Sequence, residues 1–311
     1  GAVVERAWPS VLRAARSHFG QIFLLYDDPA GVVEAAIEGR TEIPPDLEAT
    51  DDFGCVHRIW TVAEPRIHEA VRAVLRDESP VIADGHHRFE TAAQYARERR
   101  AEAGPGTHDR VRGTRGRARD EGLTVVPTHR TVRAVPDWDP EGFLRRLGEA
   151  FEVSPAPAGT APDSLAGPSG AGPAAGRASF GIALRGTDGT LACFRAILRH
   201  GLDPAAKIGG EDRPEVKRLD VSVLHRLALE PLLGIGEAEL AAGERVGYHR
   251  DASAAVREVA EGGAQAAFLL RPTPVEAVLS CARAGARLPQ KSTDFFPKLL
   301  SGLLIYDLEN P

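Results

Sequence analysis

The amino-acid sequence predicts a mixed α/β fold, and three observations support this class. Segments with the spacing of strands and segments with the spacing of amphipathic helices interleave along the whole 311-residue chain. Apolar residues make up 43% of the chain and charged residues 26%, as in ordinary globular proteins. The chain is also long enough for one large or two ordinary domains with hydrophobic cores of their own.

The first third of the chain alternates between helical and strand patterns. In order, the patterns predict a helix at 2–18, a strand at 21–28, a helix at 31–39, a strand at 54–62, a helix at 64–78, a strand at 80–84 and a helix at about 89–103. The stretch 104–121 then interrupts the alternation. It is rich in glycine and arginine and shows no apolar face, so it predicts a loop in place of a core strand.

The rest of the chain resumes the alternation. Asp139 as N-cap and Pro140 at the first helical position predict a helix at 139–150. Thr273 is the predicted cap of another helix, and Asp188-Gly189 predicts the turn of a hairpin. The remaining predictions are a strand at 122–132, a hairpin over 178–198, helices at 220–234, 251–263 and 273–285, and strands at 243–250 and 264–272.

A Pro/Gly/Ala/Ser-rich stretch at 155–177 divides the chain in two. Such a composition cannot build a core, so we expect a linker or a surface insertion there. The predicted organisation is an N-terminal part at 1–154 and a C-terminal α/β part at 178–311.

Charge and cysteine content exclude several classes of protein. The net charge of −6 gives no overall basic field and argues against a nucleic-acid partner. Three widely spaced cysteines form no C-x-x-C pair, which suits a reducing compartment and argues against a zinc site. Because no apolar run approaches the roughly 18 residues that span a bilayer, we expect a cytoplasmic protein without a membrane partner. The absence of methionine predicts that the chain is a fragment of a longer protein.

The stretch ADGHHR at 83–88 places an acid, a glycine, two histidines and an arginine between a strand and a helix. Gly85 permits a sharp turn, and the helix that follows presents the positive end of its dipole at the same point. His86, His87 and Arg88 add side-chain donors, so the stretch predicts a phosphate site. Asp84 suits such a site if it holds Mg²⁺ or accepts a proton from a hydroxyl nucleophile.

The residue types alone leave other interpretations of this stretch open. Asp84 would serve equally as a helix cap and Arg88 as a salt-bridge partner, with both histidines in half-buried structural positions. A two-histidine metal site is a weaker option, because adjacent side chains of an extended loop point in different directions.

Two further stretches offer groups that suit an oxyanion. Thr128, His129 and Arg130 end a strand, although a polar strand end is also the ordinary structural outcome. In the second stretch, 288–303, Lys291 is followed by Ser292 and Thr293, and Lys298 comes seven residues after Lys291. The glycines of a P-loop are absent before Lys291, so we reject that motif and predict a simple lysine-plus-hydroxyl phosphate contact. Only four of the 38 basic residues are lysines. Each lysine is therefore either a candidate for a compact positive charge that contacts a phosphate, or present by chance.

Four blocks occur in order along the chain and together resemble a known family. They are ADGHHRFETAAQY (83–95), GLTVVPTHR (122–130), LDVSVLHRLALEPLLG (219–234) and LPQKSTDFFPKLLSGL (288–303), preceded by GCVHRIW at 54–60. They resemble the signature blocks of the domain of unknown function (DUF) family 1015. The Asp-Gly-His-His-Arg block is similar to the phosphate-binding motif of the ParB/sulfiredoxin fold, and the family is similar to pyrophosphate-dependent free serine kinases.

The resemblance implies a ParB/sulfiredoxin-like N-terminal part and assigns roles by matching motif. Asp84 is implied as the acid near the metal or the nucleophile, and Gly85, His86, His87 and Arg88 as the phosphate cradle, so that the implied catalytic residues are Asp84, His86, His87 and Arg88. The implied further phosphate contacts are Thr128, His129, Arg130, Lys291, Ser292, Thr293 and Lys298. Family members carry an additional upstream block, which we expect to belong to the missing part of the protein.

The sequence therefore predicts a kinase-like phosphotransferase that acts on a small molecule. The expected phosphate donor is pyrophosphate or a nucleotide such as ADP or ATP, with Mg²⁺ as cofactor, and the expected acceptor is an amino-acid hydroxyl such as that of free serine. Two alternatives stay open: a ParB-like nucleotide-binding regulatory module without turnover, and an inactive truncated copy.

Overall fold

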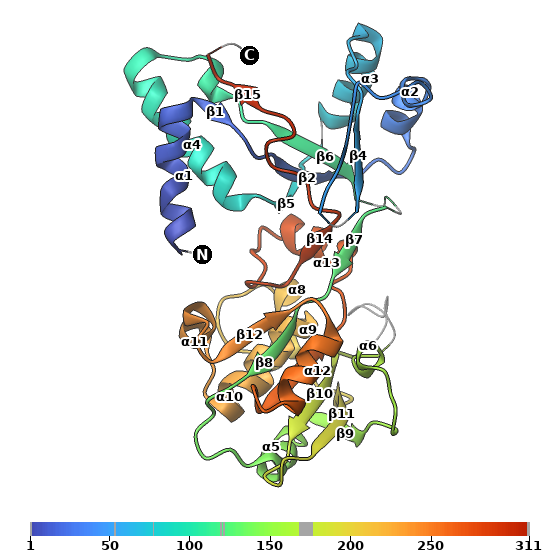
Figure 1. The fold of residues 1–311 in the computed structure, drawn as a ribbon, viewed down its shortest axis with the longest axis vertical. Helices are drawn as coiled ribbons and strands as arrows, with labels where there is room; N and C mark the ends of the chain where they lie inside the picture. The colour runs from blue at the N-terminus through green and yellow to red at the C-terminus, as the bar shows by residue number, and fades with distance from the viewer. Residues whose placement is uncertain are drawn as a thin grey trace. The chain divides into compact units, whose positions relative to one another are not determined.

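A computed structural model describes residues 2–52, 54–76, 78–118, 120, 122–167 and 177–309 (Figure 1). The chain forms two compact units: unit 1 is Gly1–Thr124 with Phe295–Pro311, and unit 2 is Val125–Asp294. Helices and strands interleave in both units, which confirms the mixed α/β class. The predicted linker 155–177 falls within unit 2; its residues 168–176 lie outside the described part of the chain.

Unit 1 contains four longer helices and several short strands. The helices are α1 (Ala2–Ala15), α2 (Val32–Thr41), α3 (Pro65–Arg76) and α4 (His86–Ala103), and a 3₁₀ turn follows at Thr107–Asp109. The strands are β1 (Ser17–His18), β2 (Ile22–Tyr26), β3 (Leu47–Thr50), β4 (Val56–Ile59), β5 (Val81–Asp84), β6 (Gly113–Arg117) and β15 (Tyr306–Asp307).

A three-stranded sheet with the order β5-β2-β6 forms the centre of unit 1. The apolar run of β2 explains its central place, because Ile22 and Leu25 are almost fully buried. Strand β5 pairs antiparallel with β2, and Asp84 at its end lies opposite Phe23. The sheet therefore fixes the start of the Asp-Gly-His-His-Arg stretch.

Strand β6 corrects the prediction of a loop over 104–121. Residues 113–117 run parallel to β2 although they carry no apolar pattern. Their glycines explain the pairing, since a Cβ atom at Gly113 would lie 2.9 Å from Leu24 Cδ1 and one at Gly116 would lie 2.8 Å from Phe23 Cε2. The large side chains of β2 thus occupy the space that side chains at these two glycines would need. Strand β6 is therefore determined by its packing against β2 and not by a hydrophobic pattern of its own.

Unit 2 is built on a six-stranded antiparallel sheet with the order β12-β8-β13-β10-β11-β9. Its strands are β8 (His129–Val132), β9 (Phe151–Pro155), β10 (Ser179–Arg185), β11 (Leu191–Leu198), β12 (Val246–His249) and β13 (Ala266–Leu270). Strands β7 (Thr124–Val126) and β14 (Asp294–Phe296) lie where the chain passes from one unit to the other.

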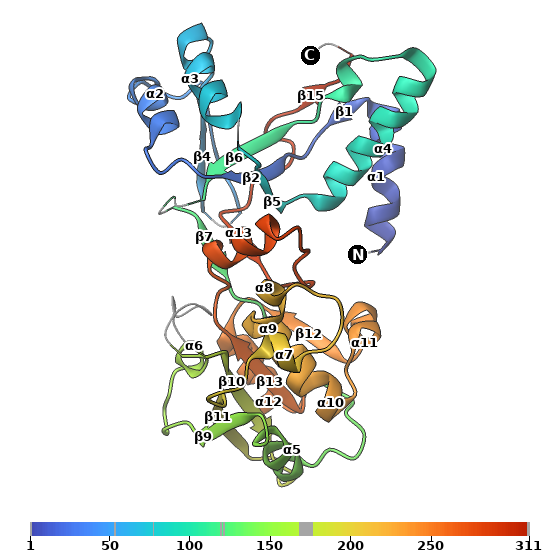
Figure 2. The same ribbon diagram turned by 180° about the vertical axis from the view of Figure 1, so that it is seen from behind.

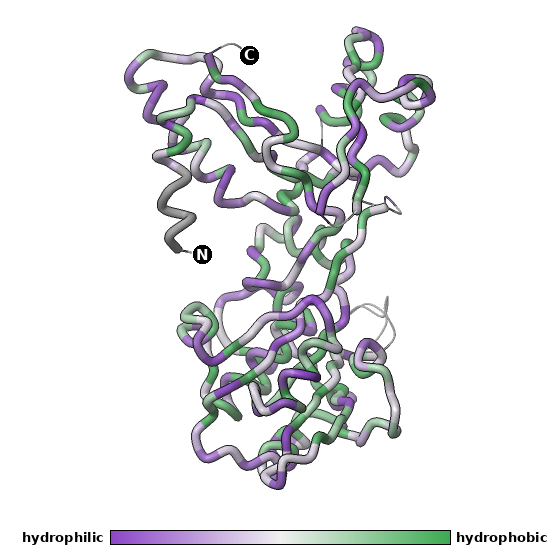
Figure 3. Tube along the Cα trace, viewed as in Figure 1, coloured by the Kyte–Doolittle hydropathy of each residue, from purple (hydrophilic) through white to green (hydrophobic). Residues whose placement is uncertain are grey.

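Short helices cover both faces of this sheet. They are α5 (Pro140–Leu147), α6 (Pro162–Leu165), α7 (Pro204–Lys207), α8 (Pro214–Lys217), α9 (Asp220–Leu224), α10 (Glu230–Leu233), α11 (Glu237–Ala242), α12 (Ala252–Ala260) and α13 (Val275–Arg283). Helix α12 lies in front of the sheet in Figure 1, and Figure 2 shows α10 and α5 from the other side. In both units hydrophilic and hydrophobic residues are interspersed along the helices (Figure 3), as expected for helices that pack on one face.

Strand alternation divides the core of unit 2 between the two faces of the sheet. Phe180 and Phe268 pack with α5 and with the segment from α8 to α10, whereas Ala183, Ala267 and Leu269 pack with α6 and α12. Side chains of successive strand residues point to opposite faces, so each strand contributes to both halves of the core. Strands that are buried on both faces have continuous apolar sequences, and such sequences were the basis for predicting β10 and β13.

Local predictions in unit 2 are confirmed with one correction. Asp139 caps α5 by accepting from the Gly142 N–H at 2.9 Å, and the hairpin turns at Asp188-Gly189 as predicted. Thr273 does not cap α13: its hydroxyl donates to the Ser292 carbonyl at 2.8 Å instead. The helix expected over 220–234 is present as a continuous run of α9, a π-helical turn at His225–Leu229 and α10, and π-helical turns are often found at functional positions.

Candidate functional site

The Asp-Gly-His-His-Arg stretch forms the junction between β5 and α4 in unit 1. Asp84 ends the strand, Gly85 is the residue before the helix, and His86 begins it, three residues earlier than predicted. Gly85 has a φ angle of 91°, in the left-handed region that favours glycine. No side chain caps this helix end, so the interpretation of Asp84 as a helix cap is wrong. As in any α-helix, the first N–H groups of α4 have no partner within the helix, and here no side-chain cap replaces one.

Arg88 folds back over this junction. Its Nη2 atom lies 3.3 Å from Asp84 Oδ2, which confirms the salt bridge, and a Cβ atom added to Gly85 would lie 2.9 Å from its Nε. A Cβ atom at Gly20 would lie 3.1 Å from Arg88 Cδ, so a glycine on each side leaves room for the arginine. The Nε atom is buried without a hydrogen-bond partner. A donor in that state favours an additional acceptor at the junction.

The two histidines of the stretch lie on the surface. His86 and His87 are both exposed, and His87 Nδ1 is 3.7 Å from the Glu90 carboxylate. Half-buried structural positions, the other interpretation of this pair, are therefore excluded. Exposed imidazoles on the first turn of a helix are accessible to an anion that approaches the helix end.

The Thr128-His129-Arg130 stretch is largely inside unit 2. Arg130 is only 1% exposed, and its guanidinium donates to the carbonyl of Thr128 and to that of Lys291, the latter at 2.8 Å. Burial lowers the pKa of Arg130 to about 10. His129 is 2% exposed and accepts from the Leu270 N–H through Nδ1 at 3.1 Å, and burial lowers its pKa to about 4. His129 is thus neutral at physiological pH.

The lysine-containing loop at 289–293 is held against these residues. Lys291 is exposed and has a φ angle of 56°, which is unusual for a residue with a side chain. Ser292 is buried and donates through Oγ to the Pro289 carbonyl, and its own carbonyl accepts from Thr273. The structure therefore brings the second and third predicted stretches together within unit 2. Lys298 belongs to unit 1, as does the Asp-Gly-His-His-Arg stretch.

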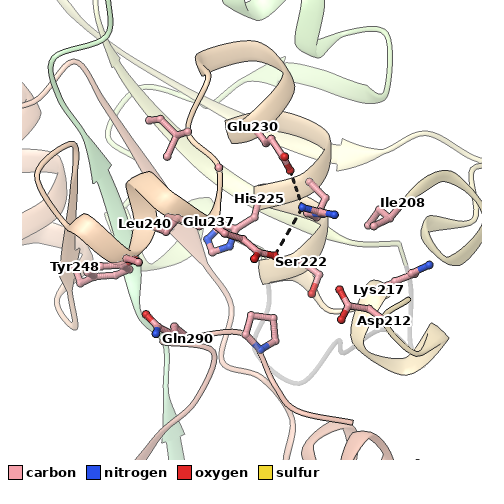
Figure 4. Close-up of a pocket in the computed structure, with 15 residues that line it drawn as sticks. Ile208, Asp212, Lys217, Ser222, His225, Glu230, Glu237, Leu240, Tyr248 and Gln290 are labelled. Carbon is pink, nitrogen blue, oxygen red and sulfur yellow. Dashed lines mark hydrogen bonds and ion pairs between the residues drawn. The ribbon is translucent and has the colours of Figure 1, made fainter. Parts of the chain in front are cut away.

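A cavity of about 330 Å³ lies beside this loop within unit 2 (Figure 4). The π-helical turn and α9 supply His225 and Ser222 to its lining, while Tyr248 and Gln290 come from β12 and from the lysine-containing loop. The site prediction missed all four residues, although the block at 219–234 contains Ser222 and His225. A serine and a histidine within an otherwise apolar helical pattern were the signal available.

In the part of the chain that the structure describes, no group of three or more His, Cys, Asp or Glu side chains gathers in a way that would hold a metal ion. Among the same residues no helix has both the length and the apolar character required to cross a bilayer.

Comparison with known proteins identifies the family. The family model described as "Protein of unknown function (DUF1015)" matches residues 5–222, more than half of the chain, so the chain belongs to this family. No curated protein matches it.

Several solved structures resemble the chain at low identity. A conserved hypothetical protein from Pyrococcus furiosus is 15% identical, with 92% of each chain covered and a TM-score of 0.39. A free serine kinase in complex with AMP and a mutant free serine kinase in complex with ADP are also 15% identical, with 92% of this chain and 89% of those chains covered and TM-scores of 0.39.

Proposed function

We propose that this protein is a small-molecule phosphotransferase that binds a phosphoryl group at the β5–α4 junction. The observation that carries the proposal is the conformation of Gly85, the residue before the 18-residue helix α4. Its positive φ angle and missing side chain leave the N-terminal end of the helix uncovered next to the guanidinium of Arg88. Helix N-termini of this kind bind phosphate through backbone N–H groups and the helix dipole. Arg88, whose buried Nε has no partner, supplies further donors to the phosphate oxygens.

Asp84 gives the junction the acid that phosphoryl transfer needs. Its side chain is 48% exposed, so the carboxylate is accessible although one oxygen faces Arg88. Mg²⁺ is commonly held by one or two protein carboxylates together with substrate phosphates, and a single carboxylate at this position fits that pattern. When bound, the metal would neutralise charge on the transferred group. Alternatively, Asp84 accepts the proton of the acceptor hydroxyl as that oxygen bonds to phosphorus and the donor's bridging oxygen departs.

The proposed donor is pyrophosphate or ADP/ATP, and the proposed acceptor is the hydroxyl of free serine. The motif resemblance to pyrophosphate-dependent free serine kinases supports both choices. The phosphate contacts of Thr128, His129, Arg130, Lys291, Ser292, Thr293 and Lys298 remain predictions. For Lys291, exposure of the side chain supports the prediction; for Arg130, nearly complete burial and two carbonyl partners favour a role in holding the loop that carries Lys291.

The test is a direct search for phosphoserine. The purified protein is incubated with L-serine, Mg²⁺ and either pyrophosphate, ADP or ATP, and the product is followed by ³¹P NMR. We expect product with at least one donor and a loss of about 10²–10⁴ in kcat for Asp84→Asn, the range typical of a general acid or base. Arg88→Gln should weaken the apparent affinity for the donor, whereas Arg97→Gln, an exposed arginine further along α4, should change neither constant.

Three outcomes would contradict the proposal. Absence of phosphoserine with all three donors excludes the phosphotransferase, and tight nucleotide binding without product would then favour a regulatory nucleotide-binding module. Binding of neither nucleotide nor pyrophosphate would favour an inactive copy. Full activity of the Asp84→Asn variant would remove Asp84 from the mechanism.

A further inference from the structure

The cavity of unit 2 contains buried polar groups whose hydrogen-bonding capacity is unused. Ser222 is 5% exposed and His225 is 8% exposed, and both line the cavity. The Ser222 Oγ and His225 Nε2 atoms are buried and have no hydrogen-bond partner. Figure 4 shows Ser222 between two groups of side chains, with His225 and Tyr248 on one side and Asp212 and Lys217 on the other. Because buried polar groups in folded proteins are almost always paired, these two atoms indicate an occupant with complementary donors and acceptors.

The charged side chains of the cavity lining do not favour an anion, because three carboxylates (Asp212, Glu230 and Glu237) outnumber the two cations (Lys217 and Arg226). Burial and the nearby charge of Arg130 lower the pKa of His225 to about 3, so the imidazole is neutral at physiological pH. The Lys217 ammonium donates to the Gly210 carbonyl at 2.8 Å. Arg226 lies 2.9 Å from Glu230 and 3.8 Å from Glu237, so its charge is already paired with these carboxylates. A carboxylate or phosphate buried in the cavity would lose its hydration, and both cations of the lining already have other partners.

The walls of the cavity are suited to a flat ring. Ile235 and Leu240 contribute apolar surface, and Tyr248 adds an aromatic ring that the Arg130 guanidinium approaches to within 5.6 Å of the ring centroid. Gln290, whose amide both donates and accepts, lies at the exposed side. A volume of about 330 Å³ lies at the lower end of the range for small-molecule sites.

We propose that this cavity binds a nucleoside through its base. A nucleobase is planar and uncharged, and its edge carries ring nitrogens and exocyclic groups that donate and accept hydrogen bonds. Ser222 and His225 meet that edge, Gln290 adds an amide, and Tyr248 contacts the face of the ring. All of these residues belong to unit 2. The proposed nucleoside site and the β5–α4 junction of unit 1 therefore share no residue, and either assignment can fail without the other.

The test uses nucleosides, which have no phosphate for the β5–α4 junction to bind. Adenosine, guanosine, cytidine and uridine are titrated into the full chain by calorimetry, with ribose, L-serine and pyrophosphate as comparison ligands. We expect one or more of the nucleosides to bind and ribose not to bind. Ser222→Ala should weaken nucleoside binding about tenfold or more, as expected for loss of a buried hydrogen bond, and Ser222→Thr should retain most of the affinity.

Two further measurements keep the outcome interpretable. Ser280→Ala, at an exposed serine of α13, is the matched control and should bind like the unchanged chain. If Ser222→Ala does not fold, Gln290→Ala replaces it, because Gln290 is exposed and its truncation removes little packing. In ¹⁵N spectra of the histidine rings, addition of nucleoside should shift the resonances of His225.

Several results would overturn the proposal. It fails if no nucleoside binds at millimolar concentration, which would leave water as the partner of Ser222 and His225. It also fails if ribose, L-serine or pyrophosphate is the ligand whose affinity falls in Ser222→Ala. Nucleoside binding that neither Ser222→Ala nor Gln290→Ala weakens would place the site elsewhere in the protein.

Discussion

Replacing Arg271 should destabilise unit 2 more than the loss of an ordinary ion pair would. Arg271 follows β13 and binds Asp220, the first residue of α9, through Nε at 2.8 Å and Nη2 at 3.0 Å. The two side chains are only 6% and 13% exposed. This ion pair links α9, the helix that contains Ser222, to the end of the central strand β13. Arg271→Met keeps much of the side-chain volume but leaves the Asp220 carboxylate buried without its partner.

The expected loss in the free energy of unfolding follows from the buried Asp220 charge that is left without a partner. Breaking a buried ion pair by removing one partner costs about 3–5 kcal/mol, whereas replacing both partners by apolar residues is often nearly neutral. We therefore expect Arg271→Met to lower the free energy of unfolding by about 3–5 kcal/mol. The double variant Arg271→Met/Asp220→Leu should recover most of this loss, a coupling that a double-mutant cycle measures.

The loss should also depend on pH. Burial already raises the pKa of Asp220 against the opposing effect of Arg271, and removal of the arginine raises this pKa further. A carboxyl group whose pKa is higher in the folded state binds more protons there, so its contribution to stability falls as pH rises above the ordinary value of 3.8. The variant should consequently be less impaired at pH 5 than at pH 7, and the double variant should lose this dependence.

The assay is urea denaturation followed by tryptophan fluorescence. Trp138 is the tryptophan of unit 2, and Trp8→Phe with Trp60→Phe removes the signal of unit 1. Arg257→Met, at an exposed arginine of α12, is the control and should stay within about 0.5 kcal/mol of the unchanged chain. A loss below about 1 kcal/mol for Arg271→Met would refute the reasoning. So would a double variant that is no more stable than the single one.

Two further predictions concern single residues. Gly85→Ala should destabilise the β5–α4 junction by about 1–3 kcal/mol, because a φ angle of 91° is strained for alanine; unchanged hydrogen-exchange protection of peptides from this junction would contradict it. For His225, a pKa of about 3 in the folded state against an ordinary 6.5 means that stability is complete above 6.5 and falls as the pH drops toward 3. At pH 5 this amounts to a loss of about 2 kcal/mol relative to pH 7.5, and the unfolding free energy of His225→Gln should lack that share of the pH dependence.

The sequence predicted well the elements whose signals are local. The cap at Asp139 and the hairpin at Asp188-Gly189 depend on residues within a few positions of one another, and both are present. The apolar runs of β10 and β13 were recognisable for the same reason. Strand β6 was missed because its stability comes from Phe23 and Leu24 of β2, which fill the space above Gly116 and Gly113. A strand specified by its neighbour's side chains has no hydrophobic period of its own.

For the candidate site, the sequence predicted the local conformation of the stretch at 83–88 but not how the other predicted residues divide between the two units. The stretch at 83–88 forms the predicted turn and salt bridge, since a strand end, a glycine and a helix start are consecutive in the chain. Lys291 and Lys298 are seven residues apart, yet the chain passes from unit 2 to unit 1 between them. Sequence spacing cannot reveal such a division, because it depends on contacts between residues far apart in the chain.

Arg130 shows that a residue type alone does not predict the partners of a side chain. Its guanidinium donates to the carbonyls of Thr128 and Lys291, and its side chain is almost completely buried. It still carries charge at neutral pH, since a pKa of about 10 lies well above 7. That charge has two consequences in unit 2: it holds the loop in which Lys291 adopts a strained conformation, and it disfavours protonation of His225. Arg130 thus holds the Lys291 loop and keeps the His225 imidazole neutral, and its phosphate contact stays a prediction.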